Sequence, residues 1–241
     1  MFSRMASRIS TQWRKLGEHL PSQCAVCRAW PAQRVCDACA ARFAPPRRRC
    51  DRCAGLLAAP VQRCGACLRE PPPLDACIAA VEYAYPWTGA LGEFKFRGDP
   101  GWAGALATLV RSTPWAEPAL EAADLVLPIP LSHARLRTRG FNQALLLARL
   151  LAPAKTDAAL LLRTHDTEAQ SHLTRAQRLR NLRGAFAVEP LRARQLQGTR
   201  VLLVDDVMTT GATLHAAALA LRQAGAAHIT GLVVARTERR D

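Results

Sequence analysis

Residues 201–214 constrain the fold of this chain more than any other segment. Four apolar residues are followed by Asp205 and Asp206, and then by a Thr-Thr-Gly-Ala-Thr run that ends at Thr213. A short apolar run of this kind is typical of a central parallel strand, and Gly211 allows a tight turn into a following helix. The free N–H groups at the start of a helix attract anions. The segment therefore predicts a strand, a phosphate-binding loop and a helix.

The two aspartates indicate which kind of molecule the bound phosphate belongs to. Adjacent carboxylates are costly to bury unless something pairs with them, and they can accept hydrogen bonds from two neighbouring hydroxyls of a ribose ring. The loop predicted to hold the 5-phosphate consists of Thr209, Thr210, Gly211, Ala212 and Thr213. The chain has neither a P-loop motif nor a Gly-x-Gly-x-x-Gly motif. The alternative is purely structural: the aspartates start a turn and Thr210 caps the helix.

Four Cys-x-x-Cys pairs form the second strong signal. Two thiolates separated by two residues can reach one ion, and two such pairs complete a tetrahedral zinc site. We favour sequential pairing, although an interleaved arrangement is open. The expected zinc ligands are Cys24, Cys27, Cys36 and Cys39 in one site, and Cys50, Cys53, Cys64 and Cys67 in the other. Disulfides and an iron–sulfur cluster are the alternatives, and the lack of a secretion signal favours zinc.

The distribution of apolar runs predicts an α/β fold with a mostly parallel sheet. Strands are expected at 78–83, 124–127, 159–163, 186–188, 201–204 and 229–234, with helices at 91–96, 102–110, 141–151 and 213–222. Composition separates a basic leader helix at 1–20, a double zinc ribbon at 21–72 and a larger domain at 73–241. Three prolines at 71–73 are the expected connector. Cys77, the ninth cysteine, is expected to be a buried apolar residue.

The net charge of +14 and the pI of about 10.4 fit a partner that is a polyanion or a phosphorylated substrate. The positive charge has two alternative origins: the arginine-rich composition can reflect coding bias, and the arginines near the cysteines can offset the charge of zinc–thiolate centres. No apolar run is long enough to span a membrane, so a cytoplasmic location is expected.

Several motifs resemble those of the ComF/GntX family, which joins a type I phosphoribosyltransferase domain to an N-terminal zinc domain. They are the phosphate loop, Phe94-Lys95-Phe96-Arg97-Gly98, Pro128-Ile-Pro-Leu131, Arg139-Gly-Phe-Asn-Gln143 and Gln170-Ser-His-Leu173, followed by Arg175, Arg178 and Asn181. The resemblance runs from about Cys24 to the C-terminus. It implies the phosphoribosyltransferase fold for the larger domain and a role in DNA uptake during competence or in DNA utilisation.

The resemblance also implies roles for single residues. Asp205 and Asp206 are the expected catalytic pair and would contact the ribose hydroxyls, directly or through Mg²⁺. Arg135, Arg139 and Lys95 are expected at the substrate, where the arginines would neutralise a diphosphate. Arg135 has an alternative as part of a solvated helix face. A polar stretch at 165–181 is expected to form a lid, and a surface helix with a basic face is the alternative.

Two functions remain open from the sequence. One is a Mg²⁺-dependent phosphoribosyltransferase that uses phosphoribosyl diphosphate, or a related ribose phosphate, and an unidentified acceptor. The other is a non-catalytic accessory that binds nucleic acid or senses a ligand with the same fold. Single-stranded DNA and the DNA-uptake machinery are the partners that would go with a role in competence.

Overall fold

The computed structural model describes residues 22–30, 32–58, 60–164 and 184–238. Contacts between residues divide the chain into two compact units, Met1–Arg42 and Phe43–Asp241. The second cysteine group therefore belongs to the same unit as the sheet. The boundaries expected from composition, at 1–20, 21–72 and 73–241, stay a prediction. The leader at 1–20 and the stretch at 165–181 lie outside the described residues.

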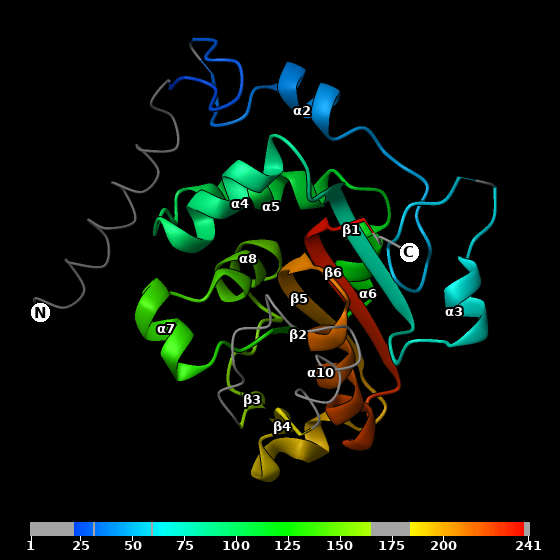
Figure 1. Ribbon diagram of the computed structural model, residues 1–241. Helices are drawn as coiled ribbons and strands as arrows, with labels where there is room; N and C mark the ends of the chain where they lie inside the picture. Colours follow the sequence, from blue (N-terminus) through cyan, green and yellow to red (C-terminus); the bar gives the residue numbers. More distant parts are fainter. Residues whose placement is uncertain (1–21, 31, 59, 165–183, 239–241) are drawn as a thin grey trace, which may run out of the picture. The chain divides into compact units, whose positions relative to one another are not determined.

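The larger unit is built on a parallel sheet of four strands, shown in Figure 1, in the order β1-β6-β5-β2. The strands are β1 (Ala76–Glu82), β2 (Leu125–Pro128), β5 (Arg200–Met208) and β6 (His228–Arg236). The central strands β5 and β6 are almost continuously apolar, because helices cover both faces of a parallel sheet. The sheet confirms the predicted fold class.

Alternate residues of the central strands face two different layers. Val201 and Leu203 of β5 pack in a core with Leu214 and Leu221 of α10 (Ala212–Gln223). The antiparallel pair of β3 (Leu161–Arg163) and β4 (Phe186–Val188) lies beside α10 on this face. On the other face, α5 (Trp102–Arg111) contacts β1 and β6, and α8 (Gln143–Leu151) contacts β2 and β5 (Figure 1).

The remaining elements are short. They are α2 (Asp37–Phe43), α3 (Gly65–Arg69), α4 (Trp87–Phe96), α6 (Ala116–Ala122), α7 (His133–Arg139) and the 3-10 helix η2 (Pro190–Leu196). All of the strands and helices predicted from apolar runs are present, with ends shifted by a few residues. In the part of the chain that is described, no helix has the length and apolar character needed to cross a membrane.

Strand β5 is longer than its apolar run. The sequence places Asp205 and Asp206 directly after the strand, but β5 continues through both to Met208. Asp205 and Val207 pair in register with Val233 and Ala235 of β6. Both carboxylates are therefore held on a regular strand near its C-terminal end, where parallel α/β sheets bind ligands.

Candidate functional site

The acidic pair on β5 meets a lysine from α4. Nζ of Lys95 lies 2.8 Å from Oδ1 of Asp206, and both side chains are largely buried. The same Oδ1 accepts a hydrogen bond from the backbone N–H of Val207 at 2.6 Å. The charge of Asp206 is therefore compensated, as a buried carboxylate requires. Lys95 and Asp206, both predicted as site residues, are in contact.

Asp205 has different surroundings. Burial, followed by the neighbouring carboxylate of Asp206, raises the pKa of Asp205 to about 7, and the charge of Lys95 opposes this shift. Asp205 Oδ1 accepts a hydrogen bond from the backbone N–H of Asp206 at 2.9 Å. One strand thus presents two adjacent carboxyl groups, and one of them can take up or release a proton near neutral pH.

The loop after β5 turns directly into α10. Gly211 has a φ of +84° and begins the helix, and its carbonyl accepts the N–H of His215 at 2.8 Å. A Cβ at this position would lie 2.5 Å from Cε of Met208 and 2.9 Å from Nε2 of His215. The backbone conformation therefore favours glycine, and a larger residue would also have to displace the side chains of Met208 and His215. The helix start at Ala212 provides N–H groups and the positive end of the helix dipole.

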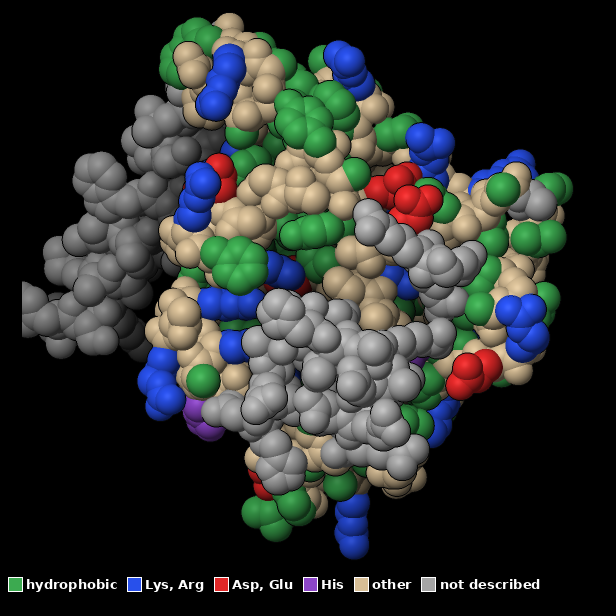
Figure 2. Space-filling view, viewed as in Figure 1, with side chains coloured by type: hydrophobic (Ala, Val, Ile, Leu, Met, Phe, Trp, Pro, Cys, Tyr) green, Lys and Arg blue, Asp and Glu red, His purple; other side chains and the backbone are tan. Residues whose placement is uncertain are grey.

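Arg139, at the end of α7, lies close to the acidic pair. Burial lowers the pKa of the Arg139 guanidinium, and the carboxylates of Asp206 and Asp205 oppose that shift. The guanidinium carbon lies 5.3 Å from the ring centroid of Phe96, whose side chain is exposed. In Figure 2, Lys and Arg side chains gather around a hollow on the face that carries α4 and α7.

Gln143 and Asn142 tie the surrounding segments together. Gln143 is buried; its Oε1 accepts a hydrogen bond from Arg139 at 3.2 Å, and its Nε2 donates to the carbonyl of Phe94 at 3.3 Å. Asn142 caps α8 and donates to the carbonyl of Ile129 at 3.0 Å. In the structure they hold Arg139 and the turn after β2.

Each group of four cysteines brings its sulfur atoms together. Within each group all Sγ atoms lie within 4.8 Å of one another, and the groups follow the sequential pairing. Sγ atoms of Cys27 and Cys36 are 3.6 Å apart, and those of Cys53 and Cys64 are 3.8 Å apart. A tetrahedral zinc site with Zn–S bonds of about 2.3 Å places its sulfurs roughly 3.8 Å apart. Both tetrads could therefore hold zinc.

The two tetrads share local details. The backbone N–H of Cys36 donates to Sγ of Cys24, and that of Cys64 donates to Sγ of Cys50, both at 3.4 Å. Although burial acts to raise it, hydrogen bonds from backbone N–H groups, of Cys27 first, lower the pKa of Cys24 to about 6. A lowered pKa favours the thiolate, which is the form that binds metals.

One buried residue near the site has no counterpart in the sequence prediction. Arg236, the last residue of β6, is 1% exposed, and its Nη1 donates to the carbonyl of Met208 at 3.1 Å and to that of Thr209. It thereby anchors the start of the phosphate loop. The sequence did contain one indication of this role: Arg236 is a charged residue at the end of an otherwise apolar strand. A charge buried at such a position has to be paired.

Comparison with known proteins identifies the family. The sequence model of the phosphoribosyl transferase domain family matches residues 141–241. The DNA utilization protein YhgH of Salmonella typhimurium is 32% identical over 232 residues, which cover 90% of this chain and 98% of that protein. The chain belongs to the ComF family. Competence protein F of Haemophilus influenzae is 32% identical over 172 residues, 68% of this chain and 73% of that protein.

A third ComF relative, competence protein ComFC of Bacillus subtilis, is 34% identical over 148 residues, 61% of this chain and 58% of that protein. In the present ComF chain, Lys95, Arg139 and the acidic pair lie together, and the phosphate loop continues from the same strand. Arg135 is half-buried, and its charge acts on that of Arg139. His165, His172, Arg175, Arg178 and Asn181 lie outside the described residues.

Proposed function

We propose that this protein binds phosphoribosyl diphosphate, or a related ribose phosphate, with Mg²⁺ and serves DNA uptake or DNA utilisation in the cytoplasm. The observation that carries the proposal is the pair Asp205 and Asp206 near the end of β5, followed after a short loop by the start of α10 at Ala212. Carboxylates suit the ribose hydroxyls, and the helix start suits the 5-phosphate. The names of the relatives, which include competence and DNA utilization proteins, support the biological role.

The charges around the acidic pair support a diphosphate. Arg139 is held by Gln143, the charges of the two aspartates act on its guanidinium, and Arg135 lies on the same helix. A planar guanidinium can pair with phosphate oxygens in a bidentate manner. In this assignment Lys95 holds Asp206 in place, and the two arginines meet the anionic end of the ligand.

The donor set also suits Mg²⁺. Magnesium prefers oxygen ligands and is commonly held by one or two carboxylates together with substrate phosphates. Asp205 and the second carboxylate oxygen of Asp206 would hold it, since Oδ1 of Asp206 is engaged by Lys95. When bound, the ion would neutralise charge on the diphosphate. The chain itself would orient the ribose through Asp205 and Asp206 and hold the phosphate at the loop.

We assign structural zinc to both tetrads, in line with the sulfur spacing. Each would hold one ion through four thiolates, with no ligand position left for a substrate. Metal analysis of the purified protein is expected to give about two zinc ions per chain. A chain that carries iron, or that keeps fewer than two ions after purification without chelators, would contradict the assignment.

The decisive experiment measures ligand binding. Phosphoribosyl diphosphate with Mg²⁺ is expected to raise the melting temperature, because a ligand that binds only the folded state stabilises it. The double substitution Asp205→Asn and Asp206→Asn is expected to abolish this rise. Glu121→Gln, which changes an exposed carboxylate on α6, is the matched control. An intact protein that shows no rise with the ligand refutes the binding site.

Turnover is a separate question with its own assay. A transferase would break the bond between the ribose C1 and the diphosphate and form a new bond from C1 to the acceptor. Diphosphate would leave with the electron pair, and the acceptor would lose a proton. Diphosphate release on addition of nucleobases would support the enzyme. Binding without release for any nucleobase supports a ligand sensor instead.

A nucleic-acid accessory is the second candidate. Arg47 and Arg48 are exposed in the larger unit, whereas Arg49 donates to the carbonyl of Ala54 at 3.0 Å. Two neighbouring exposed arginines and the net charge of +14 favour contact with phosphates. Arg47→Gln with Arg48→Gln is expected to weaken binding of single-stranded DNA and to flatten its salt dependence. Unchanged binding would exclude these two residues as a DNA contact.

A further inference from the structure

Arg236 connects the second cysteine tetrad to the phosphate loop. Its Nε donates to the carbonyl of Cys53 at 3.0 Å, while Nη1 donates to the carbonyls of Met208 and Thr209. Cys53 belongs to the tetrad, and Thr209 begins the loop. A single buried guanidinium therefore joins two segments that are about 150 residues apart in the sequence.

Apolar packing follows the same route. Ala54, which follows the ligand Cys53, is fully buried in the main core together with Cys77 and Met208. Sγ of Cys77 lies 3.6 Å from Sδ of Met208, and Cε of Met208 fills the space beside Gly211. A shift of the residues around Cys53 would therefore disturb the packing under the loop as well as its hydrogen bonds, because protein interiors are closely packed.

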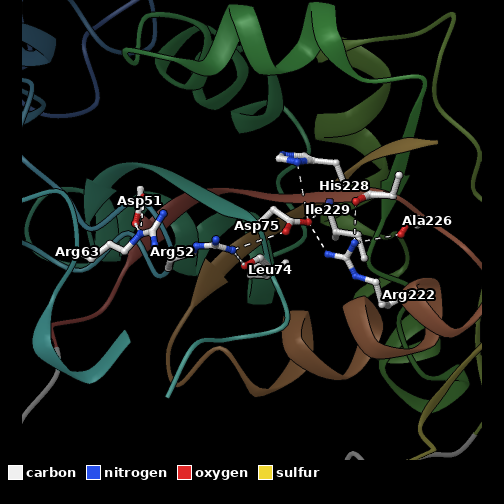
Figure 3. A network of polar contacts seen from close by, with 10 residues as sticks. Asp51, Arg52, Arg63, Leu74, Asp75, Arg222, Ala226, His228 and Ile229 are labelled. Atoms are coloured by element: carbon white, nitrogen blue, oxygen red, sulfur yellow. Dashed lines mark hydrogen bonds and ion pairs between the residues drawn. The ribbon is translucent and has the colours of Figure 1, made fainter. Parts of the chain in front are cut away.

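The turn that carries Cys50 and Cys53 is itself fixed to the sheet (Figure 3). The carbonyl of Asp51 accepts the N–H of Cys77 at 2.7 Å, and Arg52 donates to the carbonyl of Leu74 at 2.9 Å. Oδ1 of Asp75 lies 3.7 Å from Nη1 of Arg52, and Oδ2 of Asp75 forms an ion pair with Arg222 of α10. The turn is thus attached to the first strand and, through Asp75, to the helix that starts at the phosphate loop.

The first tetrad has the same local geometry and lies in the other compact unit. Arg28 follows Cys27 with a φ of 65°, as Ala54 follows Cys53 with a φ of 53°. Arg28 is exposed, however, and its tetrad belongs to the other compact unit. The two tetrads therefore form a natural pair for comparison: each has four cysteines and the same turn, and the second belongs to the same compact unit as the loop.

We propose that Arg236 is a positioning residue through which the tetrad of Cys50, Cys53, Cys64 and Cys67 sets the affinity of the phosphate loop. Arg236 engages the carbonyls of Met208 and Thr209, which keeps these electronegative groups from turning toward an anion. Loss of metal from the second tetrad frees the Cys53 carbonyl to move and leaves the guanidinium with one fewer acceptor. The effect on affinity rests on the proposed ribose-phosphate site, whereas the effect on loop order does not.

The test compares Cys64→Ser with its counterpart Cys36→Ser in the full chain. Each variant is expected to lose about one zinc ion. Amide hydrogen exchange without ligand is expected to accelerate at residues 208–213 in Cys64→Ser only, while residues 229–234 keep their protection. Titration with phosphoribosyl diphosphate and Mg²⁺ is expected to give at least tenfold weaker binding for Cys64→Ser and unchanged binding for Cys36→Ser.

Arg236→Lys supplies an independent variant. Lysine keeps the charge but lacks the planar fork that reaches several carbonyls, so the same local exchange is expected with zinc retained in both tetrads. If this variant does not fold, the two cysteine variants still decide. Equal effects of Cys64→Ser and Cys36→Ser, or faster exchange throughout the sheet, would overturn the proposal. Local exchange as expected in a protein that never binds the ligand would refute only the proposed function.

Discussion

Nζ of Lys95 lies 2.8 Å from Oδ1 of Asp206 in largely buried surroundings, so the last turn of α4 and the end of β5 are joined by an ion pair. Lys95 belongs to the Phe-Lys-Phe-Arg-Gly motif and Asp206 to the phosphate-loop motif. The pair therefore connects two segments that the sequence could only place side by side through family resemblance.

Removal of Lys95 is expected to destabilise the protein. Lys95→Gln leaves Asp206 as a buried carboxylate without its cation, which should lower the free energy of unfolding by about 3 kcal/mol. Urea denaturation measures the change. Arg97→Gln is the control, because Arg97 is 78% exposed and forms a 3.7 Å pair with Glu93, which should contribute less than about 0.5 kcal/mol. If both variants lose the same free energy of unfolding, the buried Lys95–Asp206 pair contributes no more to stability than an exposed pair.

The pKa of Asp205 predicts a pH dependence of stability. Because this pKa is raised from 3.8 to about 7, the folded state keeps a proton that the unfolded chain releases. The contribution of Asp205 to stability is therefore fully present below about pH 4 and is lost as the pH rises toward 7, by at most about 1.4 kcal/mol per pH unit. Urea denaturation of the ligand-free protein between these pH values measures it.

Asp205→Asn should remove this part of the pH profile, since asparagine does not titrate in this range. Glu121→Gln, an exposed position, should keep the wild-type profile. If the profiles of the wild type and Asp205→Asn run parallel between pH 4 and 7, Asp205 does not titrate as described.

Gly211→Ala is expected to damage both the fold and the ligand site. A left-handed conformation costs an L residue about 1–2 kcal/mol, and the added Cβ would meet Met208 and His215. Chemical denaturation should show this loss, and phosphoribosyl diphosphate should no longer raise the melting temperature. Gly104→Ala in α5 is the control: its Cβ has no neighbour within 4 Å, so it should stabilise the helix by about 0.5–1 kcal/mol. Full ligand binding by Gly211→Ala would exclude a close fit at the loop.

Thiol reactivity should separate Cys77 from the tetrads. Burial raises the pKa of Cys77 to about 12, and its sulfur packs against Met208. After zinc removal at pH 8, iodoacetamide should label the exposed Cys27 first and leave Cys77 unmodified until the chain unfolds, as mass spectrometry of the peptides would show. Labelling of Cys77 in the folded, zinc-loaded protein would contradict its place in the core.

The sequence allowed most of the sheet to be predicted because buried parallel strands are continuous apolar runs. It could not show that β5 continues through Asp205 and Asp206, because the pairing with β6 rather than hydrophobicity sets the end of that strand. Helix α7 was predicted only as an alternative for Arg135, because none of its residues is buried and it has no apolar periodicity.

Several of the residues predicted for the site lie together in the structure, but their contacts could not be predicted. Asp205, Asp206 and the loop follow from one local motif, and Lys95 and Arg139 followed from resemblance. The roles of Gln143 and Arg236 depend on packing between segments far apart in the chain, which no local pattern encodes. The three arginines at 47–49 look alike in the sequence, yet only the third is bonded to the carbonyl of Ala54.

The burial of Ala54 has a consequence for how the two cysteine modules can diverge. Arg28 is exposed, so its size and charge can change without disturbing a packed core. Residue 54 occupies a closed space in the core, so only small side chains that tolerate a left-handed backbone are acceptable there. The equivalent position in the two cysteine turns therefore tolerates very different substitutions.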